Sequence, residues 1–196
     1  MNTPSHWLMT AGLRKYLQWP LPGAAVLWGS IAPDIPLYML SFGGMFYYRT
    51  LLGWSDTQTF HHLFDDLYFH HPFWIASHNL LHSPTLLLLG LIVLWRWRHS
   101  ASQVVSWLMW FLLACLLHSV VDILTHVDDG PVLFFPFEWT IRFQSPVSYW
   151  DSNHYGTQFS RFEVALDLLL VFYLSGPRVW RWISTRRANM IAEPPQ

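Results

Sequence analysis

Long apolar runs alternate with polar segments along the chain, and two of these runs are free of formal charge. The run at residues 100–121 is 22 residues long, and the run at residues 75–95 ends at the cluster Arg96, Trp97 and Arg98. A helix rises about 1.5 Å per residue, so about 20 residues cross the roughly 30 Å hydrocarbon core of a bilayer. Basic and aromatic residues anchor such a helix at the interface. We therefore predict a membrane-spanning helix in each run.

Two further apolar runs are weaker. Residues 24–42 are interrupted by two prolines that flank Asp34, and residues 164–174 are short and contain Asp167. A proline inside a helix removes a backbone hydrogen bond and breaks or kinks the helix. Each run therefore predicts either a complete span or an incomplete, re-entrant helix.

The composition agrees with a membrane protein. Hydrophobic residues make up 53% of the chain, charged residues only 12%, and the mean hydropathy is +0.24. A net charge of -1 provides no basic surface for nucleic acid. Cys115 is the single cysteine, so a disulfide framework is excluded and any metal must use His, Asp or Glu. We expect one membrane-embedded helical domain over residues 1–196, with a disordered tail at about 188–196.

The basic residues predict an orientation. In a model with four spans, eight of the eleven lysines and arginines fall on one side, which the positive-inside rule places in the cytoplasm together with both termini. Residues 43–74 and 127–162 then form two long outward loops. The predicted fold is an all-α, polytopic helical bundle of about four spans in the inner (plasma) membrane. The eight residues are Arg14, Lys15, Arg96, Arg98, Arg178, Arg181, Arg186 and Arg187.

A row of polar residues closes the run at 100–121. His118, Asp122 and His126 are spaced four apart, so on a helix they share one face and extend over about 12 Å of its axis. His118 and Asp122 could bind one metal ion together. His126 lies too far along an ideal helix to join them unless the helix end unwinds or a second ion is present. The alternative is a polar seam of hydrogen bonds between helices.

A second histidine pair stands at the outward end of the run at 75–95. His78 and His82 are four residues apart, at a depth similar to that of His126. Imidazole and carboxylate ligands together suit zinc, manganese or iron, and ligand type alone does not choose among them. Alternatively, His82 caps or packs near Pro84 and only His78 faces inward.

Asp34 lies between Pro33 and Pro36 inside an apolar segment. The prolines free backbone groups around the carboxylate, which is costly in a membrane without a cation. A metal is one such cation. Pairing with an arginine or capping of a half-helix explains the motif equally well.

The predicted outward loops contain further polar candidates. Glu163 opens the fourth helix at the expected level of the metal. Asp128 and Asp129 precede Gly130 and predict a helix stop, and they could also hold ligating histidines in position. His154 is a candidate for the lining of the site. Most other loop polar residues are expected to form turns or caps.

Four short motifs resemble those of the YdjM-type inner-membrane proteins, a bacterial family of metal-dependent hydrolases whose active-site pattern is related to zinc-dependent phospholipase C. The resemblance spans most of the chain. The matching residues are His6 in TPSH, Gly29, Pro33 and Asp34 in the turn, His78, His82 and Ser83 in HNLLHS, and His118 and Asp122 in HSVVD.

The resemblance implies a divalent metal site, with zinc as the leading candidate. His6, Asp34, His82, His118 and Asp122 would be the ligands, with Asp34 and Asp122 as the catalytic carboxylates, and Asp34 is alternatively the base that accepts a proton from water. His78 would line the same site. Asn79 stands where the family usually has a basic residue, so the resemblance implies no phosphate-gripping role there. In the four-span model His6 falls on the cytoplasmic side, so either residues 5–17 dip toward the site or His6 is not a ligand.

These features predict a membrane-bound hydrolase that acts on an ester, phosphoester or amide of a lipid or other small molecule. The expected partners are membrane lipids and the substrate. One alternative is a metal- or proton-binding transport protein without hydrolytic activity. A purely structural role for the polar residues is another.

Overall fold

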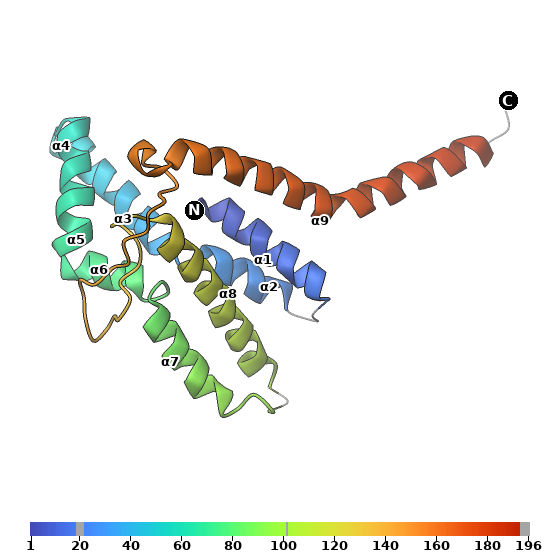
Figure 1. The fold of residues 1–196 in the computed structure, drawn as a ribbon, viewed down its shortest axis with the longest axis horizontal. Coiled ribbons are helices and arrows are strands. Elements are labelled where there is room, and N and C mark those ends of the chain that lie inside the picture. Colours follow the sequence, from blue (N-terminus) through green and yellow to red (C-terminus); the bar gives the residue numbers. More distant parts are fainter. Residues whose placement is uncertain (19–21, 101, 193–196) are drawn as a thin grey trace.

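The computed structural model describes residues 1–18, 22–100 and 102–192. Within these ranges every regular element is a helix, and one isolated bridge joins Val132 and Arg142. The predicted all-α class is confirmed (Figure 1). The helical segments are α1 (Thr3–Leu17), α2 (Gly23–Ile31), α3 (Ile35–Met45), η1 (Phe46–Leu51), α4 (Asp56–His61), η2 (His62–Leu67), α5 (Tyr68–His70), α6 (Pro72–Asn79), α7 (Pro84–Trp95), α8 (Gln103–Thr125), η3 (Ser152–His154) and α9 (Gly156–Ala192).

Helix α8 is the central element, and it packs against α1, α2 and α7. It begins where the Ser102 hydroxyl accepts a hydrogen bond from the Val105 amide. Gly29 permits the close approach of α2, because a Cβ at this position would lie 2.4 Å from the carbonyl oxygen of Phe111 and 2.6 Å from the Cβ of Ala114. A glycine is therefore required at this helix crossing.

Among the described residues, α8 alone is long and apolar enough to cross a membrane as one helix. Two bent pairs, α2 with α3 and η1 (bent by 43°) and α6 with α7 (bent by 47°), also qualify if each pair counts as one span. The structure thus contains one to three candidate spans, against the four predicted. Helix α9 does not qualify, because Glu163, Asp167 and Arg178 interrupt its apolar segment.

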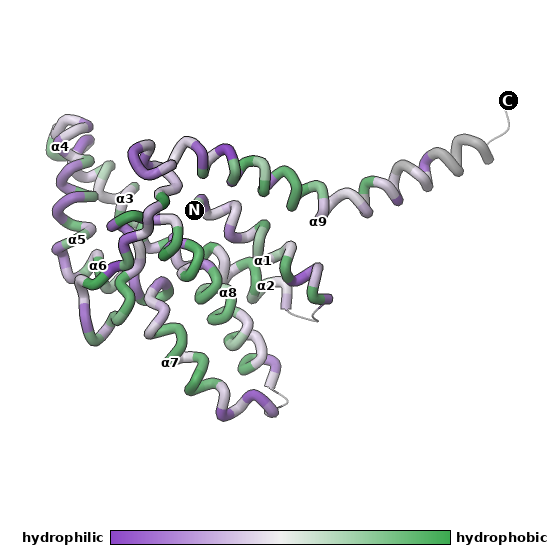
Figure 2. Tube along the Cα trace, viewed as in Figure 1, coloured by the Kyte–Doolittle hydropathy of each residue, from purple (hydrophilic) through white to green (hydrophobic). Residues whose placement is uncertain are grey.

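The apolar surface of these helices is suited to lipid. Only 22% of the apolar window of α8 is buried inside the protein, and α7 exposes several aliphatic side chains, among them Ile92 and Val93. Figure 2 shows long hydrophobic segments along α7 and α8. Exposed apolar area of this extent is typical of a membrane-facing surface.

Helix α9 is 37 residues long, contacts α1, and extends past the other helices in Figure 1. Its backbone stays helical through residues 188–192, the first part of the predicted disordered tail. Those residues (ANMIA) contain no glycine or proline that would stop a helix. Residues 193–196 of that tail lie outside the described residues.

The two segments predicted as long loops differ in structure. Residues 43–74 form a succession of short helices, whereas residues 127–162 are mostly irregular. They meet beside the C-terminal end of α8, where the Tyr68 hydroxyl donates to the carbonyl of Asp129 at 2.6 Å. Backbone hydrogen bonds from Ser145 to His126 and from Tyr149 to Thr125 also hold the irregular segment against α8. Together the two segments cover the end of α8 that carries the polar row.

Candidate metal centre

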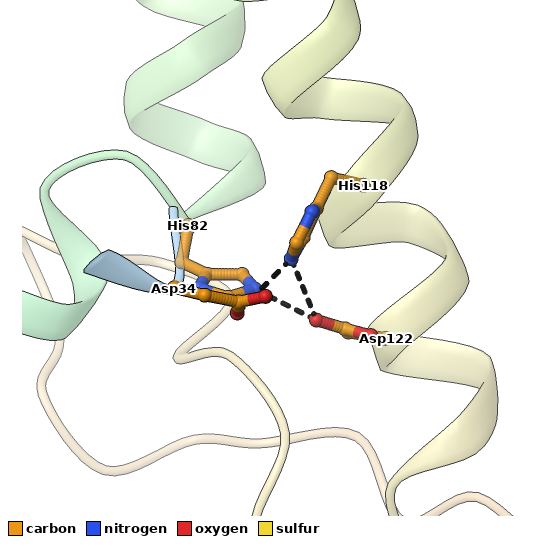
Figure 3. A group of neighbouring side chains, drawn as sticks. All are labelled: Asp34, His82, His118 and Asp122. Carbon is orange, nitrogen blue, oxygen red and sulfur yellow. Dashed lines mark hydrogen bonds and ion pairs between the residues drawn. The ribbon is translucent and has the colours of Figure 1, made fainter. Parts of the chain in front are cut away.

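Four side chains converge at one point, two of them from breaks between helices and two from one face of α8. Asp34 lies between α2 and α3, His82 lies between α6 and α7, and His118 and Asp122 lie on α8 (Figure 3). One ligand atom from each residue lies within 4.8 Å of the others. His82, His118 and Asp122 are buried, and the Asp34 side chain is 16% exposed. This arrangement could hold one metal ion.

Local sequence explains how each ligand is presented. His118 and Asp122 share a face of α8 because they are one helical turn apart, and His118 Nε2 lies 3.0 Å from Asp122 Oδ2. Pro33 and Pro36 bend the chain so that Asp34 Oδ1 lies 3.3 Å from His118 Nε2. His82 precedes Pro84 at the start of α7, and its Nε2 lies 2.8 Å from Asp122 Oδ2.

The hydrogen bond made by His118 Nδ1 fixes the tautomer of the neutral His118 ring. Nδ1 lies 2.8 Å from the carbonyl oxygen of Ser30, which can only accept, so Nδ1 carries a proton. In the neutral imidazole Nε2 is then a lone pair, and it has no hydrogen-bond partner among the described residues. This lone pair faces the carboxylates of Asp34 and Asp122. A cation can neutralise these groups, either a proton on Nε2, which would give ion pairs with Asp122 and Asp34, or a metal ion. A backbone carbonyl on the far nitrogen is typical of metal-binding histidines.

The second oxygen of Asp122 faces the N-terminal segment. Asp122 Oδ1 lies 2.9 Å from His6 Nε2 and 2.9 Å from the amino group of Met1. The His6 ring stacks on that of His118 at 3.7 Å, and burial lowers the pKa of His6, which favours the neutral imidazole. The start of α1 therefore reaches the centre. His6 nevertheless lies outside the group of four ligand atoms.

His126 also lies outside that group. Helix α8 ends at Thr125, and His126 is extended, with its Nδ1 donating to the carbonyl of Asp122 at 2.9 Å. Its Nδ1 is 3.9 Å from Asp122 Oδ1, and its ring packs on Tyr149. Burial lowers the pKa of His126. The helix end thus directs His126 to the backbone of Asp122 and to a neighbouring cavity.

His78 is a neighbour of the centre, and its ring centroid lies 4.5 Å from that of His82. His78 Nε2 lies 3.2 Å from the Tyr68 hydroxyl, a residue for which the sequence offered no functional signal. Burial raises the pKa of Tyr68, so the hydroxyl keeps its proton. Asp129 accepts a hydrogen bond from Trp150 Nε1 at 2.9 Å, and Asp128 is exposed beside it.

The remaining candidates lie apart from the group of four. His154 pairs with Asp151 at 2.6 Å and is 44% exposed. Glu163 is buried and accepts hydrogen bonds from the backbone and side chain of Asn2. Thr3, which the sequence did not single out, donates a short hydrogen bond to Asp34 and lies 2.8 Å from the Tyr38 hydroxyl.

A cavity of about 450 Å³ opens beside the metal centre. Asp34, His82 and Asp122 form part of its wall, together with His78 and His126. The rest is contributed by the N-terminal segment, by Leu37 and Tyr38 of α3, and by the two segments that cover α8. Aromatic rings are frequent in this wall, namely Tyr38, Phe60, Phe64, Tyr68, Phe69, Tyr149 and Trp150.

Comparison with known proteins identifies one family. Residues 1–188 match the family model described as YdjM inner membrane protein. Neither a curated protein nor a solved structure matches the chain.

Proposed function

The chain belongs to the YdjM inner membrane protein family, and from that premise we propose that it is a membrane-bound, metal-dependent hydrolase. The metal is a divalent ion, with zinc first and manganese or iron as alternatives. Its ligands are Asp34, His82, His118 and Asp122. The bond cleaved is an ester, a phosphoester or an amide, and the substrate is a lipid or another small molecule.

His118 is the observation that carries this proposal. Its Nδ1 donates to the Ser30 carbonyl, and its Nε2 lies 3.0 Å from Asp122 Oδ2 and 3.3 Å from Asp34 Oδ1. When Nε2 carries a lone pair, repulsion between this nitrogen and the two carboxylates is costly in a buried site. A divalent ion removes that cost, because it accepts the lone pair and offsets both carboxylates.

The ligand set also suits catalysis. Two imidazoles and two carboxylates are ligands that zinc accepts, and a catalytic site needs one side open to substrate. Here Asp34, His82 and Asp122 line the cavity. When bound, such an ion polarises the bond to be cleaved and activates water. Asp34, the most exposed of the four, either completes the ligand set or accepts the proton of the attacking water.

The depth of the polar groups favours hydrolysis over transport. Every buried residue of α8 lies between Ala114 and Thr125, and none lies between Gln103 and Leu113. A path for protons or metal ions would need polar groups that reach both faces of the membrane. The buried polar side chains of α8 are instead confined to one end.

We also propose a multi-pass topology in which the connection between α7 and α8 and the C-terminus are cytoplasmic, whereas the N-terminus, with the Met1 amino group 2.9 Å from Asp122, lies at the metal centre and not in the cytoplasm as the four-span model predicted. The basic residues Arg96 and Arg98 follow α7 and precede α8, at the end of α8 far from Asp122. By the positive-inside rule this end faces the cytoplasm. The metal centre and its cavity then face the outer side of the membrane.

The test is the metal content of detergent-purified protein, measured by elemental mass spectrometry, with the affinity tag at the C-terminus. The expected result is about one zinc, manganese or iron ion per chain, lost in His118→Ala and Asp122→Ala. His154→Ala is the control, because His154 lies outside the cavity wall, and this variant should retain its metal. Hydrolysis of ester, phosphoester and amide lipids should disappear with a chelator and return with the metal.

Two outcomes would contradict the proposal. Wild-type protein without metal even after reconstitution would make the cluster a hydrogen-bonded seam. Full metal content in Asp122→Ala would place the ion elsewhere.

A further inference from the structure

Carboxylates dominate the wall of the cavity beside the metal centre. Five aspartates line the cavity, whereas no lysine or arginine among the described residues does. A divalent ion would offset two of the five, and a third has the imidazole of His61 at 2.5 Å. The amino group of Met1 also lines the cavity, but it is bound to one of the metal-centre carboxylates. The five aspartates are Asp34, Asp65, Asp122, Asp128 and Asp129.

Asp128 and Asp129 line this cavity next to Gly130, whose carbonyl binds Arg142. Neither forms an ion pair with a lysine, arginine or histidine of the described chain. The Oδ1 atom of Asp129 is buried and has no hydrogen-bond partner there. The other oxygen of Asp129 accepts from Trp150 Nε1, which is neutral. This side of the cavity therefore attracts a positive group.

His78 adds a hydrogen-bond acceptor to the same cavity. The Tyr68 hydroxyl donates its proton to the carbonyl of Asp129, so it must accept from His78 Nε2. His78 Nδ1 is then a lone pair. His78 is only 5% exposed and lines the cavity, and its Nδ1 has no partner in the described structure. His78 Nδ1 and Asp129 Oδ1 are thus two buried, unpaired acceptors in residues that line the cavity.

The rest of the wall is suited to a cation with an apolar tail. Tyr149 and Trp150 stand beside the two adjacent aspartates, and an ammonium group binds favourably to such ring faces. Leu37, Phe60 and Phe64 supply an apolar surface farther along the wall. A polar head and a hydrocarbon tail can therefore be bound by different parts of one cavity.

We propose that this cavity binds an amphipathic substrate whose polar end carries a protonated, N–H-bearing amine. Asp128, Asp129 and His78 bind the amine, and the aromatic wall binds the tail. The inference rests on the proposed function, since the cavity matters for catalysis only if the adjoining group of four holds a metal. An anionic head without an amine is disfavoured by the same carboxylates.

The test uses three amphiphiles with one tail, namely octylammonium, octanol and octyl sulfate. Binding to zinc-loaded protein in detergent at pH 7 is measured by isothermal titration calorimetry. Octylammonium should bind about tenfold more tightly than octyl sulfate. The double variant Asp128→Asn/Asp129→Asn should lose that preference. Asp66→Asn, which removes an exposed carboxylate outside the cavity wall, should keep it.

Each amphiphile partitions into detergent micelles to the same extent whichever variant is present. Differences between variants therefore report binding in the cavity. Equal or tighter binding of octyl sulfate to the wild type, or a preference for octylammonium that survives the double variant, would overturn the inference. If the double variant loses zinc, the single variant Asp128→Asn replaces it in the test, because the Asp128 side chain is exposed and its substitution should leave the metal centre intact. Zinc content is measured on the same samples: absence of zinc from the wild type overturns the proposed function, whereas bound zinc without a preference overturns only the inference.

Discussion

The Glu163 carboxylate on α9 accepts two hydrogen bonds from Asn2 at the start of α1, one from the backbone N–H at 2.7 Å and one from the side-chain amide at 2.8 Å. Glu163 is 3% exposed, so water cannot readily replace these hydrogen bonds to its carboxylate. The pair fixes the segment that places Met1, Thr3 and His6 against the metal centre. Glu163 is therefore a positioning residue for the N-terminal part of the site.

Glu163→Ala should lower the stability of the protein by about 1–3 kcal/mol, because it removes two part-buried, charge-assisted hydrogen bonds that join α9 to the start of α1. Metal content should fall less than in Asp122→Ala. Glu163→Gln, which keeps an oxygen acceptor, should be milder. Thermal unfolding in detergent and metal analysis measure both effects, and a Glu163→Ala variant that unfolds at the wild-type temperature would show that the pair positions nothing.

The histidines should differ in their importance for metal binding. His82→Ala removes a member of the group of four and should weaken zinc binding by more than about 100-fold. His126 lies outside the group, so His126→Ala should weaken zinc binding by less than about 100-fold. Competition with a zinc-binding dye measures both. Greater loss in His126→Ala than in His82→Ala would show that His126 is a ligand, as the row on α8 first indicated.

Removing the metal should destabilise the wild-type protein. At a free zinc concentration of about 100 times Kd, binding contributes about 2.7 kcal/mol, so a chelator should lower Tm by about 5–10 °C. Asp122→Ala should show no such shift. A chelator effect of equal size in that variant would mean that the stabilising metal lies outside the proposed centre.

The crossing of α2 and α8 should not tolerate a larger residue at Gly29. The Cβ of Gly29→Ala would meet the Phe111 carbonyl, and we expect a loss of about 1–3 kcal/mol in thermal unfolding. Gly43→Ala on α3 is the matched control, since nothing lies within 4 Å of a Cβ there. That variant should be neutral or slightly more stable. Equal stability of the two variants would argue against the close crossing.

The proposed orientation can be tested with single cysteines, because Cys115 is buried and is the only native cysteine. Ser152→Cys, near the cavity, should react with a membrane-impermeant maleimide on intact spheroplasts. Ser100→Cys, at the other end of α8, should react only after lysis. Wild-type protein should remain unlabelled in both conditions. The reverse pattern would invert the topology.

The sequence by itself determined the elements whose signals are local. The apolar run that became α8, the pairing of His118 with Asp122 one turn apart, and the break at Asp34 follow from helical periodicity and from proline chemistry. The all-helical class follows from the same patterns. These features depend on residues close together in the chain.

Only the tertiary structure decided which distant groups meet. His82 contacts Asp122, His6 reaches the same carboxylate, and His126 lies outside the group of four. These positions depend on how the helices cross and where each one ends. The Ser30 carbonyl that fixes the tautomer of His118 carries no side-chain signal at all, since every residue has a carbonyl. Distances between helices are set by packing, as at Gly29, and a pattern along one chain segment does not encode them.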